Sequence, residues 1–220
     1  MNQPRLSIRK LRIWKQDYLT YRYLWSNIEW AVKKARSQTS NSTPFVLDVG
    51  CGNKPYADLF EGCNYKGMDC TTINSLPDIV GDATNIPFES NTIDIVFCTQ
   101  VIEHITEPKA VIEEFYRVLK PDGFLILTGP FYWPLHEEPF DFYRFTKYGF
   151  EHLLKNAGFS TWEIKADGGT WAQIFLSINL QVRSKFLVLI RVLLNLLGAM
   201  LDKINYQENS PANYTILAQK

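Results

Sequence analysis

The stretch VLDVGCGNKPY, residues 46–56, decides the fold class of this 220-residue chain. It places an apolar, β-branched run directly before the turn Gly50-Cys51-Gly52, and glycines in such a turn allow positive φ and a close approach of the backbone to a ligand. A dinucleotide fingerprint needs a glycine or alanine where Pro55 stands. A P-loop needs Ser or Thr after its lysine, but Lys54 is followed by that proline. The turn is thus a candidate ligand-binding loop with neither phosphate-cradling motif.

Short strand-like runs alternate with helical runs on the carboxyl side of this turn. We predict strands at 45–49, 64–69, 77–82, 93–98 and 123–129, and helical segments at 55–61 and 107–120. Such alternation favours a parallel sheet that is covered on both faces, with ligands bound at the carboxyl ends of its strands. A helix at 146–157 and strands at 159–165 and 214–218 complete the prediction.

Aspartates stand at the ends of the first three predicted strands: Asp48, Asp69 and Asp82. A carboxylate at Asp69 can accept hydrogen bonds from both hydroxyls of a ribose, and one at Asp82 can accept from an adenine amino group. Each aspartate taken alone has an alternative reading as a turn former or a helix cap. Their order and spacing after the glycine turn favour a nucleoside-binding site.

With these residues in this order, the chain resembles the class I S-adenosylmethionine-dependent methyltransferases over about residues 45–166 and the last strand. The segments IDIVFCTQVIEHI (93–105) and YRVLKPDGFLILTGP (116–130) resemble further motifs of that family. The resemblance implies S-adenosylmethionine as cofactor and an α/β, Rossmann-like methyltransferase fold. We therefore expect a seven-stranded, mostly parallel sheet flanked by helices, with an N-terminal helix and a helical insertion before the last strand.

The resemblance also implies which residues bind the cofactor. The glycine turn would surround its methionine part, Asp69 would hold the ribose, and Asp82-Ala83 would flank the adenine. The implied cofactor-binding set is Asp48, Gly50, Cys51, Gly52, Asp69, Asp82, Ala83, Thr99 and Gln100. Lys54 departs from members that carry a glycine at this position. We interpret Cys51 and Cys98 as small packing residues near the cofactor and not as nucleophiles.

The acceptor side is predicted in GPFYWPLHEEPFDFYRFTKYGF, residues 129–150, which contains nine aromatic residues. Aromatic residues interleaved with polar ones suit a pocket that stacks and orients a planar or sugar-like acceptor. His136 is the candidate general base, with a loop-positioning role as the alternative. Tyr143 and Arg144 are candidates for orienting the acceptor, although Arg144 has a structural alternative in pairing with Asp141 or Glu138.

Part of the same loop, the pattern HExPxDFYRFT, resembles a subgroup of small methyltransferases often associated with cell-surface glycan or lipid pathways. His104, which follows Glu103, is interpreted as an architectural or pocket-edge residue. Four cysteines without a CxxC pair and only three histidines predict no metal site and no disulfide scaffold. The absence of a signal-like apolar segment near residue 1 leads us to expect a cytoplasmic protein.

A net charge of zero conceals an uneven distribution. Residues 1–44 carry +7, residues 45–170 carry −10 and residues 171–205 carry +3. We divide the chain into a basic aromatic helical segment (1–44), a methyltransferase core (45–169), an apolar helical insertion (170–205) and the final strand (206–220). The acidic core disfavours a nucleic-acid partner.

The two basic segments are also apolar. In the first, Leu11, Trp14, Tyr18, Tyr21, Trp25, Ile28 and Val32 recur at helical spacing. This stripe predicts either a lid over the cofactor or pocket, or a helix lying on anionic lipid. The run FLVLIRVLLNLLGAML (186–201) is too short and too interrupted by Arg191 and Asn195 to span a bilayer. It requires burial against the core, against a second subunit in a homodimer, or shallowly in a membrane.

The sequence thus predicts methyl transfer to a small-molecule or glycan- or lipid-linked acceptor, most simply at oxygen. The alternative from another class is a non-catalytic binding protein or membrane adaptor that retains the fold. A nicotinamide-dependent reductase is disfavoured by Pro55 and by the lack of a recognisable hydride-transfer site.

Overall fold

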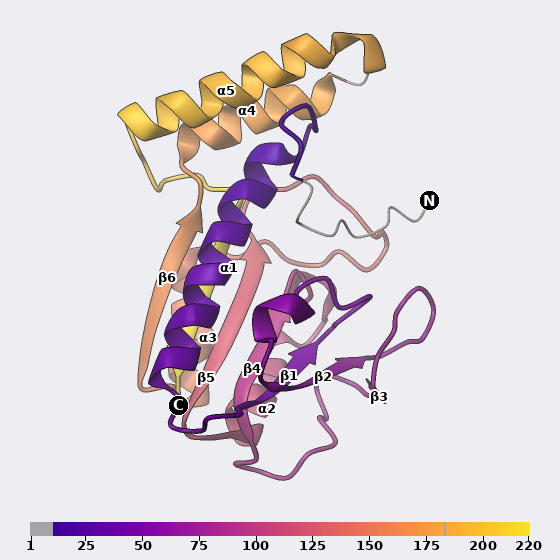
Figure 1. Cartoon of the computed structure of the whole chain (residues 1–220), viewed down its shortest axis with the longest axis vertical. Coiled ribbons are helices and arrows are strands. Elements are labelled where there is room, and N and C mark those ends of the chain that lie inside the picture. The colour runs from indigo at the N-terminus through magenta and orange to yellow at the C-terminus, as the bar shows by residue number, and fades with distance from the viewer. Residues whose placement is uncertain (1–10, 183) are drawn as a thin grey trace.

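The computed structural model of the chain describes residues 11–182 and 184–220. The basic residues Arg5, Arg9, Lys10 and Arg183, which contribute to the charges given above, lie outside these ranges. A seven-stranded sheet forms the centre of the molecule (Figure 1). Its strands are β1 (Phe45–Val49), β2 (Asn64–Asp69), β3 (Ile79–Val80), β4 (Ile93–Thr99), β5 (Leu119–Pro130), β6 (Thr161–Asp167) and β7 (Asn213–Gln219).

The order of the strands is β3-β2-β1-β4-β5-β7-β6. Strands β1 to β5 run parallel, and β7 is antiparallel to both of its neighbours, β5 and β6. The predicted fold class, a mostly parallel Rossmann-like sheet with seven strands, is therefore confirmed. From β1 the chain moves outward to β2 and β3 and then returns to β4 on the other side. Open α/β sheets bind their ligands at such a reversal, next to the carboxyl ends of the strands.

Helices cover both faces of the sheet (Figure 1). The helical elements are α1 (Tyr18–Gln38), α2 (Pro108–Val118), α3 (Lys147–Ala157), α4 (Thr170–Gln181) and α5 (Val188–Ile204), with 3-10 turns η2 (Ala57–Phe60), η3 (Ile102–His104) and η4 (Lys185–Leu187). All seven residues of β4 are buried because alternate side chains enter different cores. Phe97 packs with α1, whereas Val96 packs with α2 and α3. Pro108 at the start of α2, and Thr146 capping the Gly149 N–H at the start of α3, fix these helix boundaries.

The predicted N-terminal helix forms, but its buried face differs from the expected stripe. Leu24, Ile28 and Val32 pack on the sheet, whereas Leu11 and Trp14 precede the helix and are exposed. Tyr18, Tyr21 and Trp25 are only partly buried. The stripe was misplaced because the aromatic side chains lie along the border of the buried face, and smaller residues such as Ala31 and Ala35 fill its centre. The helix is one layer of the core.

Two local expectations in the first half of the chain also need correction. The helix expected at 55–61 is only the four-residue turn η2, which is followed by Gly62 at φ +84°. Instead, α1 covers this face, and Trp25 stacks on Tyr56 with 5.7 Å between the ring centroids. Strand β3 has only two residues, so Asp82 lies in a turn beyond it and not at its end.

Candidate functional site

The loop after β1 is fixed to the end of β2. The backbone N–H groups of Gly50 and Cys51 both donate to the Met68 carbonyl, over 2.8 and 3.1 Å. The N–H of Gly52 donates to Asp69 Oδ2 over 3.0 Å, and the N–H of Thr71 donates to the other oxygen of that carboxylate over 3.3 Å. Thus Asp69 lies directly beside the glycine turn, at the point where the family resemblance would place the ribose.

Glycine is required at the first position of this turn. Gly50 has φ +72°, a conformation that side chains with a Cβ rarely adopt. A Cβ at Gly50 would lie 2.3 Å from Cγ2 of Val101, which follows β4. The loops that follow β1 and β4 are therefore in direct contact. Gly52 also has positive φ, at +50°, as the sequence predicted for a turn that brings the backbone close to a ligand.

Asp48 and Cys51 lie beneath the turn and are almost completely buried. The hydroxyl of Tyr65 donates a hydrogen bond to Asp48 Oδ2. Burial, reinforced by the nearby charge of Asp48, raises the pKa of Cys51 to about 12. Burial also raises the pKa of Cys98 well above its ordinary value. Both thiols stay protonated at neutral pH, which agrees with their interpretation as packing residues.

Asp82 and Ala83 follow β3 and lie near the Asp69 end of β2. The N–H of Gly81 donates to the Asp69 carbonyl over 3.0 Å, which holds this turn against β2. Asp82 Oδ1 accepts hydrogen bonds from the backbone N–H and the hydroxyl of Thr84, each over 2.8 Å. Asp82 is therefore a turn former, and its side chain is exposed beside the carboxyl end of β2.

Thr99 and Gln100 end β4 on the opposite side of β1. Gln100 has φ +54°, and its backbone N–H and side-chain Nε2 both donate to Thr128 Oγ1 on β5 over 3.1 Å. These bonds fix the turn in a left-handed conformation, and such strained residues occur frequently at binding sites. The structure therefore brings the whole predicted cofactor set to the carboxyl ends of β1 to β4, with Asp48 and Cys51 as its buried support.

The predicted acceptor region, residues 129–150, comprises the end of β5, the loop 131–146 and the start of α3. We call residues 131–146 the acceptor loop, and this loop is attached to η3. The N–H groups of Phe142 and Tyr143 both donate to the Glu103 carbonyl, over 2.9 and 3.3 Å. His104 Nδ1 lies 2.6 Å from the Phe140 carbonyl. Since η3 begins two residues after Gln100, these contacts place the acceptor loop beside the predicted cofactor site. Several aromatic side chains of this loop are exposed: Tyr132, Phe140, Phe142 and Tyr143.

Arg144 is fully occupied inside the acceptor loop. It binds both oxygens of Asp141 over 2.7 Å, and its remaining donors reach the carbonyls of Trp133, Pro134 and Tyr143. These five bonds use every N–H that a guanidinium has. This geometry favours the pairing with Asp141 considered above over direct orientation of an acceptor. The same guanidinium holds the pKa of Asp141 well below its usual range.

Tyr143 and His136 differ in which of their polar atoms are already bound within the chain. The Tyr143 hydroxyl donates to the Thr106 carbonyl over 3.0 Å, so it can offer only its lone pairs to an acceptor. His136 Nδ1 lies 3.2 Å from Asp141 Oδ2, and its backbone N–H donates to the same oxygen. Its second ring nitrogen, Nε2, lies 3.9 Å from Glu103 Oε1.

Glu103 is the residue that sequence reasoning missed. It is completely buried, and neither of its carboxylate oxygens has a hydrogen-bond partner among residues 11–182 and 184–220. Burial raises the pKa of Glu103 to about 8, an effect larger than the opposing one of Arg144. The sequence showed only that Glu103 precedes His104. A glutamate in the turn directly after a buried parallel strand was the available signal, because that turn belongs to the ligand-binding edge.

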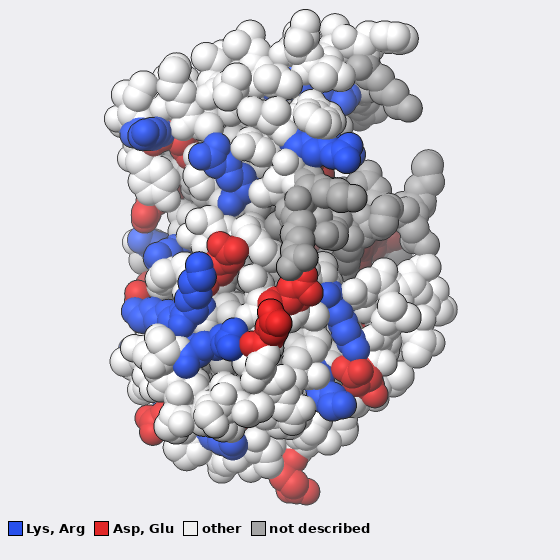
Figure 2. Space-filling model, viewed as in Figure 1, with Lys and Arg blue, Asp and Glu red and all other residues white. Residues whose placement is uncertain are grey.

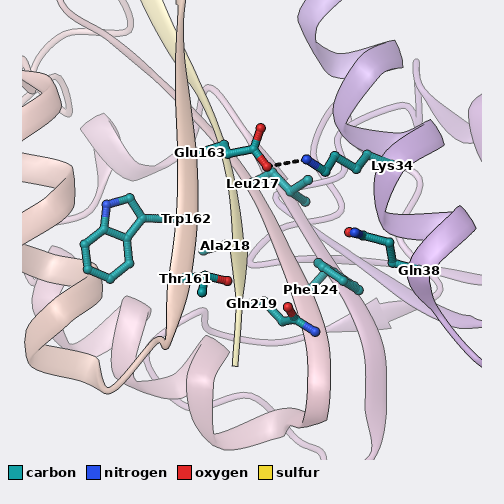
Figure 3. Close-up of a pocket in the computed structure, with 9 residues that line it drawn as sticks. All are labelled: Lys34, Gln38, Phe124, Thr161, Trp162, Glu163, Leu217, Ala218 and Gln219. Atoms are coloured by element: carbon teal, nitrogen blue, oxygen red, sulfur yellow. Dashed lines mark hydrogen bonds and ion pairs between the residues drawn. The ribbon is translucent and has the colours of Figure 1, made fainter.

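A small cavity lies at the opposite edge of the sheet (Figure 3). Its volume is about 130 Å³, and its lining includes Gln38 at the end of α1, Phe124 and Thr161 near the starts of β5 and β6, and Gln219 at the end of β7. The ion pair between Lys34 and Glu163 closes one side (Figure 3). Typical ligand pockets measure roughly 300–1,000 Å³. This cavity is therefore separate from the candidate site and too small for a nucleoside.

Comparison with known proteins shows which family the sequence resembles. Residues 47–127 match the family model described as a methyltransferase domain. The chain is 32% identical over 110 residues to the tRNA (carboxymethyluridine(34)-5-O)-methyltransferase of Arabidopsis thaliana, with 46% of this chain and 27% of that protein covered. It is 36% identical over 94 residues to the demethylmenaquinone methyltransferase of Paenarthrobacter aurescens, with 38% and 37% covered. The chain thus spans well under half the length of either relative.

The fold is likewise shared with solved methyltransferases. A SAM-dependent methyltransferase from Archaeoglobus fulgidus superposes with a TM-score of 0.59 at 15% identity, over 88% of this chain and 93% of that one. At this identity the likeness concerns the fold, whereas the family model matches the sequence from within β1 to within β5. Residues 47–127 thus match a methyltransferase domain, and the described chain has the fold of solved S-adenosylmethionine-dependent methyltransferases.

Proposed function

We propose that this chain transfers a methyl group from S-adenosylmethionine to a small-molecule or glycan- or lipid-linked acceptor, at an oxygen atom. The observation that carries the proposal is the hydrogen bond between the glycine turn and Asp69. It lies beside the acceptor loop, which is hydrogen-bonded to Glu103 in η3. The names of the two relatives specify a modified uridine in tRNA and a demethylmenaquinone as substrates. Since these acceptors differ, the proposed acceptor class rests on this chain's own loop at residues 129–150.

The residues at the sheet edge fit S-adenosylmethionine. The left-handed turn at Gly50 and Gly52 keeps Cβ atoms away from the position that the methionine part would occupy. The Asp69 carboxylate, already fixed by two backbone N–H groups, retains lone pairs for ribose hydroxyls. Asp82 and Ala83 would flank the adenine, and Thr99 and Gln100 would close the site from β4. These roles are the ones that the family resemblance implied.

The acceptor must be aligned with the methyl group, and an acceptor hydroxyl must also lose its proton. When bound, S-adenosylmethionine supplies a methyl group that its positively charged sulfur has already activated. The protein then has to position the acceptor, and a hydroxyl acceptor must also lose its proton. His136 is the candidate base because Asp141 Oδ2 lies 3.2 Å from its Nδ1, an arrangement that orients the imidazole. Arg144 positions Asp141, and the exposed aromatic residues would stack the acceptor.

A methyl-transfer screen tests this proposal against its alternative, a non-catalytic binding or adaptor protein. The full chain is incubated with radiolabelled S-adenosylmethionine and fractions of lipids, glycans and small molecules, with bulk tRNA as a separate arm. We expect label in one of the first three fractions and, if His136 is the base, at least a hundredfold slower transfer by His136→Gln. His152→Gln, which changes the exposed histidine on α3, is the matched control. Cofactor binding without transfer in any arm would favour the adaptor.

Helix α5 buries polar residues and exposes apolar ones, which is the reverse of the usual arrangement in a soluble protein. Its buried residues are Asn195, Gly198 and Asp202. Asn195 donates to the carbonyls of Ile13 and Lys15, and Asp202 accepts from the N–H groups of Gly169 and Ala172. Eleven large apolar side chains of α4, η4 and α5 are exposed: Ile174, Ile178, Phe186, Leu187, Val188, Leu189, Ile190, Leu193, Leu196, Met200 and Ile204. We call this surface the α4–α5 apolar face.

Among residues 11–182 and 184–220, no helix is long and apolar enough to cross a bilayer. The α4–α5 apolar face is nevertheless bordered by groups that suit the surface of one. Trp14 is 44% exposed, with Arg12 over its ring, and Lys15 and Lys203 are also exposed. Figure 2 shows the α4–α5 end of the molecule nearly free of charge, with Lys and Arg side chains along its lower border.

We therefore propose that the α4–α5 apolar face rests shallowly on a membrane that contains anionic lipids. An apolar face flanked by Trp, Arg and Lys is the composition of interfacial anchors. This location would bring a lipid-linked acceptor to the same end of the molecule as the acceptor loop. The other occupant, a second copy of the chain, is tested together with it: flotation with anionic vesicles supports lipid, whereas a stable dimer without flotation would contradict it.

A further inference from the structure

Three side chains with metal-ligating atoms converge where η3 faces the acceptor loop. Glu103 Oε1 lies 3.8 Å from His104 Nε2 and 3.9 Å from His136 Nε2. One ligand atom from each residue can be chosen so that all three lie within 4.8 Å of one another. Two of the three residues are adjacent in the chain, and the third comes from the loop after β5. The fold of the acceptor loop thus assembles the cluster.

The carboxylate of Glu103 lacks a hydrogen-bond partner within the described part of the chain. Glu103 is 0% exposed, and both of its oxygens are without a hydrogen bond there. Leaving a buried polar group without a hydrogen bond destabilises the folded state, and more so when the group is charged. The distances of 3.8 and 3.9 Å to the two imidazoles are too long for hydrogen bonds. A carboxylate in this position is suited to a ligand placed between it and the imidazoles.

The hydrogen bonds of the two histidines leave the inward-facing nitrogens free to coordinate. His104 Nδ1 lies 2.6 Å from the Phe140 carbonyl, which can only accept, so Nδ1 carries the proton. His136 Nδ1 lies 3.2 Å from Asp141 Oδ2, which favours the same tautomer. With this tautomer, the lone pair of each imidazole is on Nε2, the nitrogen that lies 3.8 or 3.9 Å from Glu103 Oε1. Histidine ligands of metal ions are oriented in this way, by a carbonyl or a carboxylate on the other nitrogen.

From this geometry we infer that Glu103, His104 and His136 form a binding site for a divalent transition-metal ion such as Zn²⁺. Two imidazoles and one carboxylate are a known ligand set for zinc and for iron(II). Metal–ligand bonds of about 2.0–2.2 Å place the donor atoms roughly 3.3–3.5 Å apart. The separations of 3.8 and 3.9 Å would have to contract by a few tenths of an ångström. The two histidine nitrogens, which lie within 4.8 Å of each other, would approach by up to about 1.5 Å through rotation of the two side chains. This inference differs from the expectation, drawn from the sequence, that the chain has no metal site.

The proposed site has room for further ligands. The side chains of His104 and His136 are 17% and 29% exposed, so one side of the cluster is open to solvent. Glu137 Oε2 lies 3.8 Å from His104 Nε2 and could supply a fourth ligand. An open position beside the acceptor loop would allow the ion to bind an acceptor hydroxyl and lower its pKa. In the loaded site His136 would be a ligand, and that role would replace its role as base.

Metal binding can be tested without any methyl transfer. The full chain, without a histidine tag and freed of metal by a chelator, is titrated calorimetrically with ZnCl₂ and, separately, with MgCl₂. We expect one Zn²⁺ per chain and no comparable binding of Mg²⁺, which prefers oxygen ligands. Titration with CoCl₂ should give visible absorption bands without a thiolate-to-cobalt charge-transfer band. A strong charge-transfer band would overturn the proposal, because it would place the ion on the cysteines.

Variants assign the ligands. His104→Ala and His136→Ala should each weaken Zn²⁺ binding at least tenfold, and the nearly isosteric Glu103→Gln should do the same. His152→Ala is the matched control and should bind like the wild type. Circular dichroism and the melting temperature show whether each variant folds, and His136→Ala, at a partly exposed position, is the one least sensitive to misfolding. Unchanged Zn²⁺ affinity in folded His104→Ala and His136→Ala would overturn the inference. Neither outcome depends on cofactor binding, so this test and that of the proposed function fail separately.

Discussion

The backbone N–H of Gly52 donates a hydrogen bond to Asp69, with 3.0 Å between the nitrogen and Oδ2. The two residues are 17 positions apart: Gly52 lies in the turn after β1, and Asp69 ends the neighbouring parallel strand β2. This bond makes the glycine turn and the carboxylate one unit, because a movement of either would strain the other. The unit lies between β2 and β4, at the reversal of the sheet, and the account of the cofactor site depends on it.

Gly50→Ala should destabilise the protein and abolish cofactor binding. The new Cβ would need positive φ and would lie 2.3 Å from Val101 Cγ2. We expect the free energy of unfolding to fall by about 2 kcal/mol or more, from backbone strain and overpacking together. Urea unfolding measures this change. In Gly149→Ala, the matched control on α3, the new Cβ would meet only Thr146 Oγ1 at 3.5 Å, so a loss similar to that of Gly50→Ala would contradict the argument.

Arg144→Lys should loosen the acceptor loop without changing its net charge. A lysine cannot replace the five hydrogen bonds of the guanidinium, and the side chain of Asp141 is only 1% exposed. We expect a loss of at least about 2 kcal/mol in the free energy of unfolding, because a buried carboxylate loses its bidentate partner. Lys109→Ala removes an exposed ion pair with Glu113 and should cost less than about 0.5 kcal/mol. Equal effects of the two variants would contradict the structural role of Arg144.

Asp167 predicts a pH dependence of stability. Burial raises its pKa to about 7, against the hydrogen bonds from Asn27 and Thr215 that oppose the shift. Between its unfolded pKa, about 3.9, and 7, the folded state binds more protons than the unfolded state. Its contribution to stability is therefore fully present at low pH and is lost as the pH rises toward 7 and above.

Asp167→Asn should remove this loss. An asparagine can keep its Oδ1 as the acceptor of both bonds, from Asn27 Nδ2 at 2.7 Å and from Thr215 Oγ1 at 2.8 Å. At pH 8 the variant should be more stable than the wild type, by on the order of 2–4 kcal/mol, and the difference should shrink toward pH 4. Urea unfolding across this range measures it, with the exposed Asp122→Asn as control. A constant difference between variant and wild type would show that the carboxylate does not titrate as described.

Charges placed on the α4–α5 apolar face should prevent membrane binding. Phe186 and Leu189 are 97% and 83% exposed, so Phe186→Glu with Leu189→Glu should leave folding intact. We expect the wild type to float with vesicles of anionic lipid and the double variant to remain in the soluble fraction. Tyr148→Glu, at an exposed aromatic residue on α3, should float like the wild type. Light scattering measures the oligomeric state of both proteins. A wild-type dimer that becomes a monomer in the double variant would show that the face binds a second subunit.

Much of the fold was predictable because local signals and tertiary structure agree. The apolar run before Gly50 and the aspartates after the first strands identified the sheet edge, since a parallel sheet brings these ends together. Helix α3 was predicted within one residue because Thr146 and Gly158 are strong boundary signals. The stripe on α1 was misplaced because the buried face includes Leu24, which the prediction left out, and the alanines Ala31 and Ala35, which carry little hydrophobic weight.

The acceptor side was less predictable, because its geometry depends on contacts across the sequence. His136, Tyr143 and Arg144 lie in one loop, and their predicted roles stay predictions. Whether Arg144 has a free N–H donor could not be predicted, because it depends on five acceptor atoms that the fold brings together. Glu103 gained its significance only from burial, which the sequence does not reveal at a turn. The insertion was predicted to require burial, and yet its apolar residues face outward while Asn195 and Asp202 face the core. Periodicity alone cannot show which face of a helix is buried.

The most direct test of the central claim is calorimetric titration of the wild-type chain with S-adenosylhomocysteine, alongside Asp69→Asn. We predict one binding site per chain in the wild type. Binding should weaken about tenfold to a hundredfold in Asp69→Asn, because charge-assisted hydrogen bonds to the ribose are lost. Asp122→Asn, at the opposite edge of the sheet, should bind like the wild type. Absence of binding by the folded wild type, or undiminished binding by Asp69→Asn, would contradict the cofactor site described above.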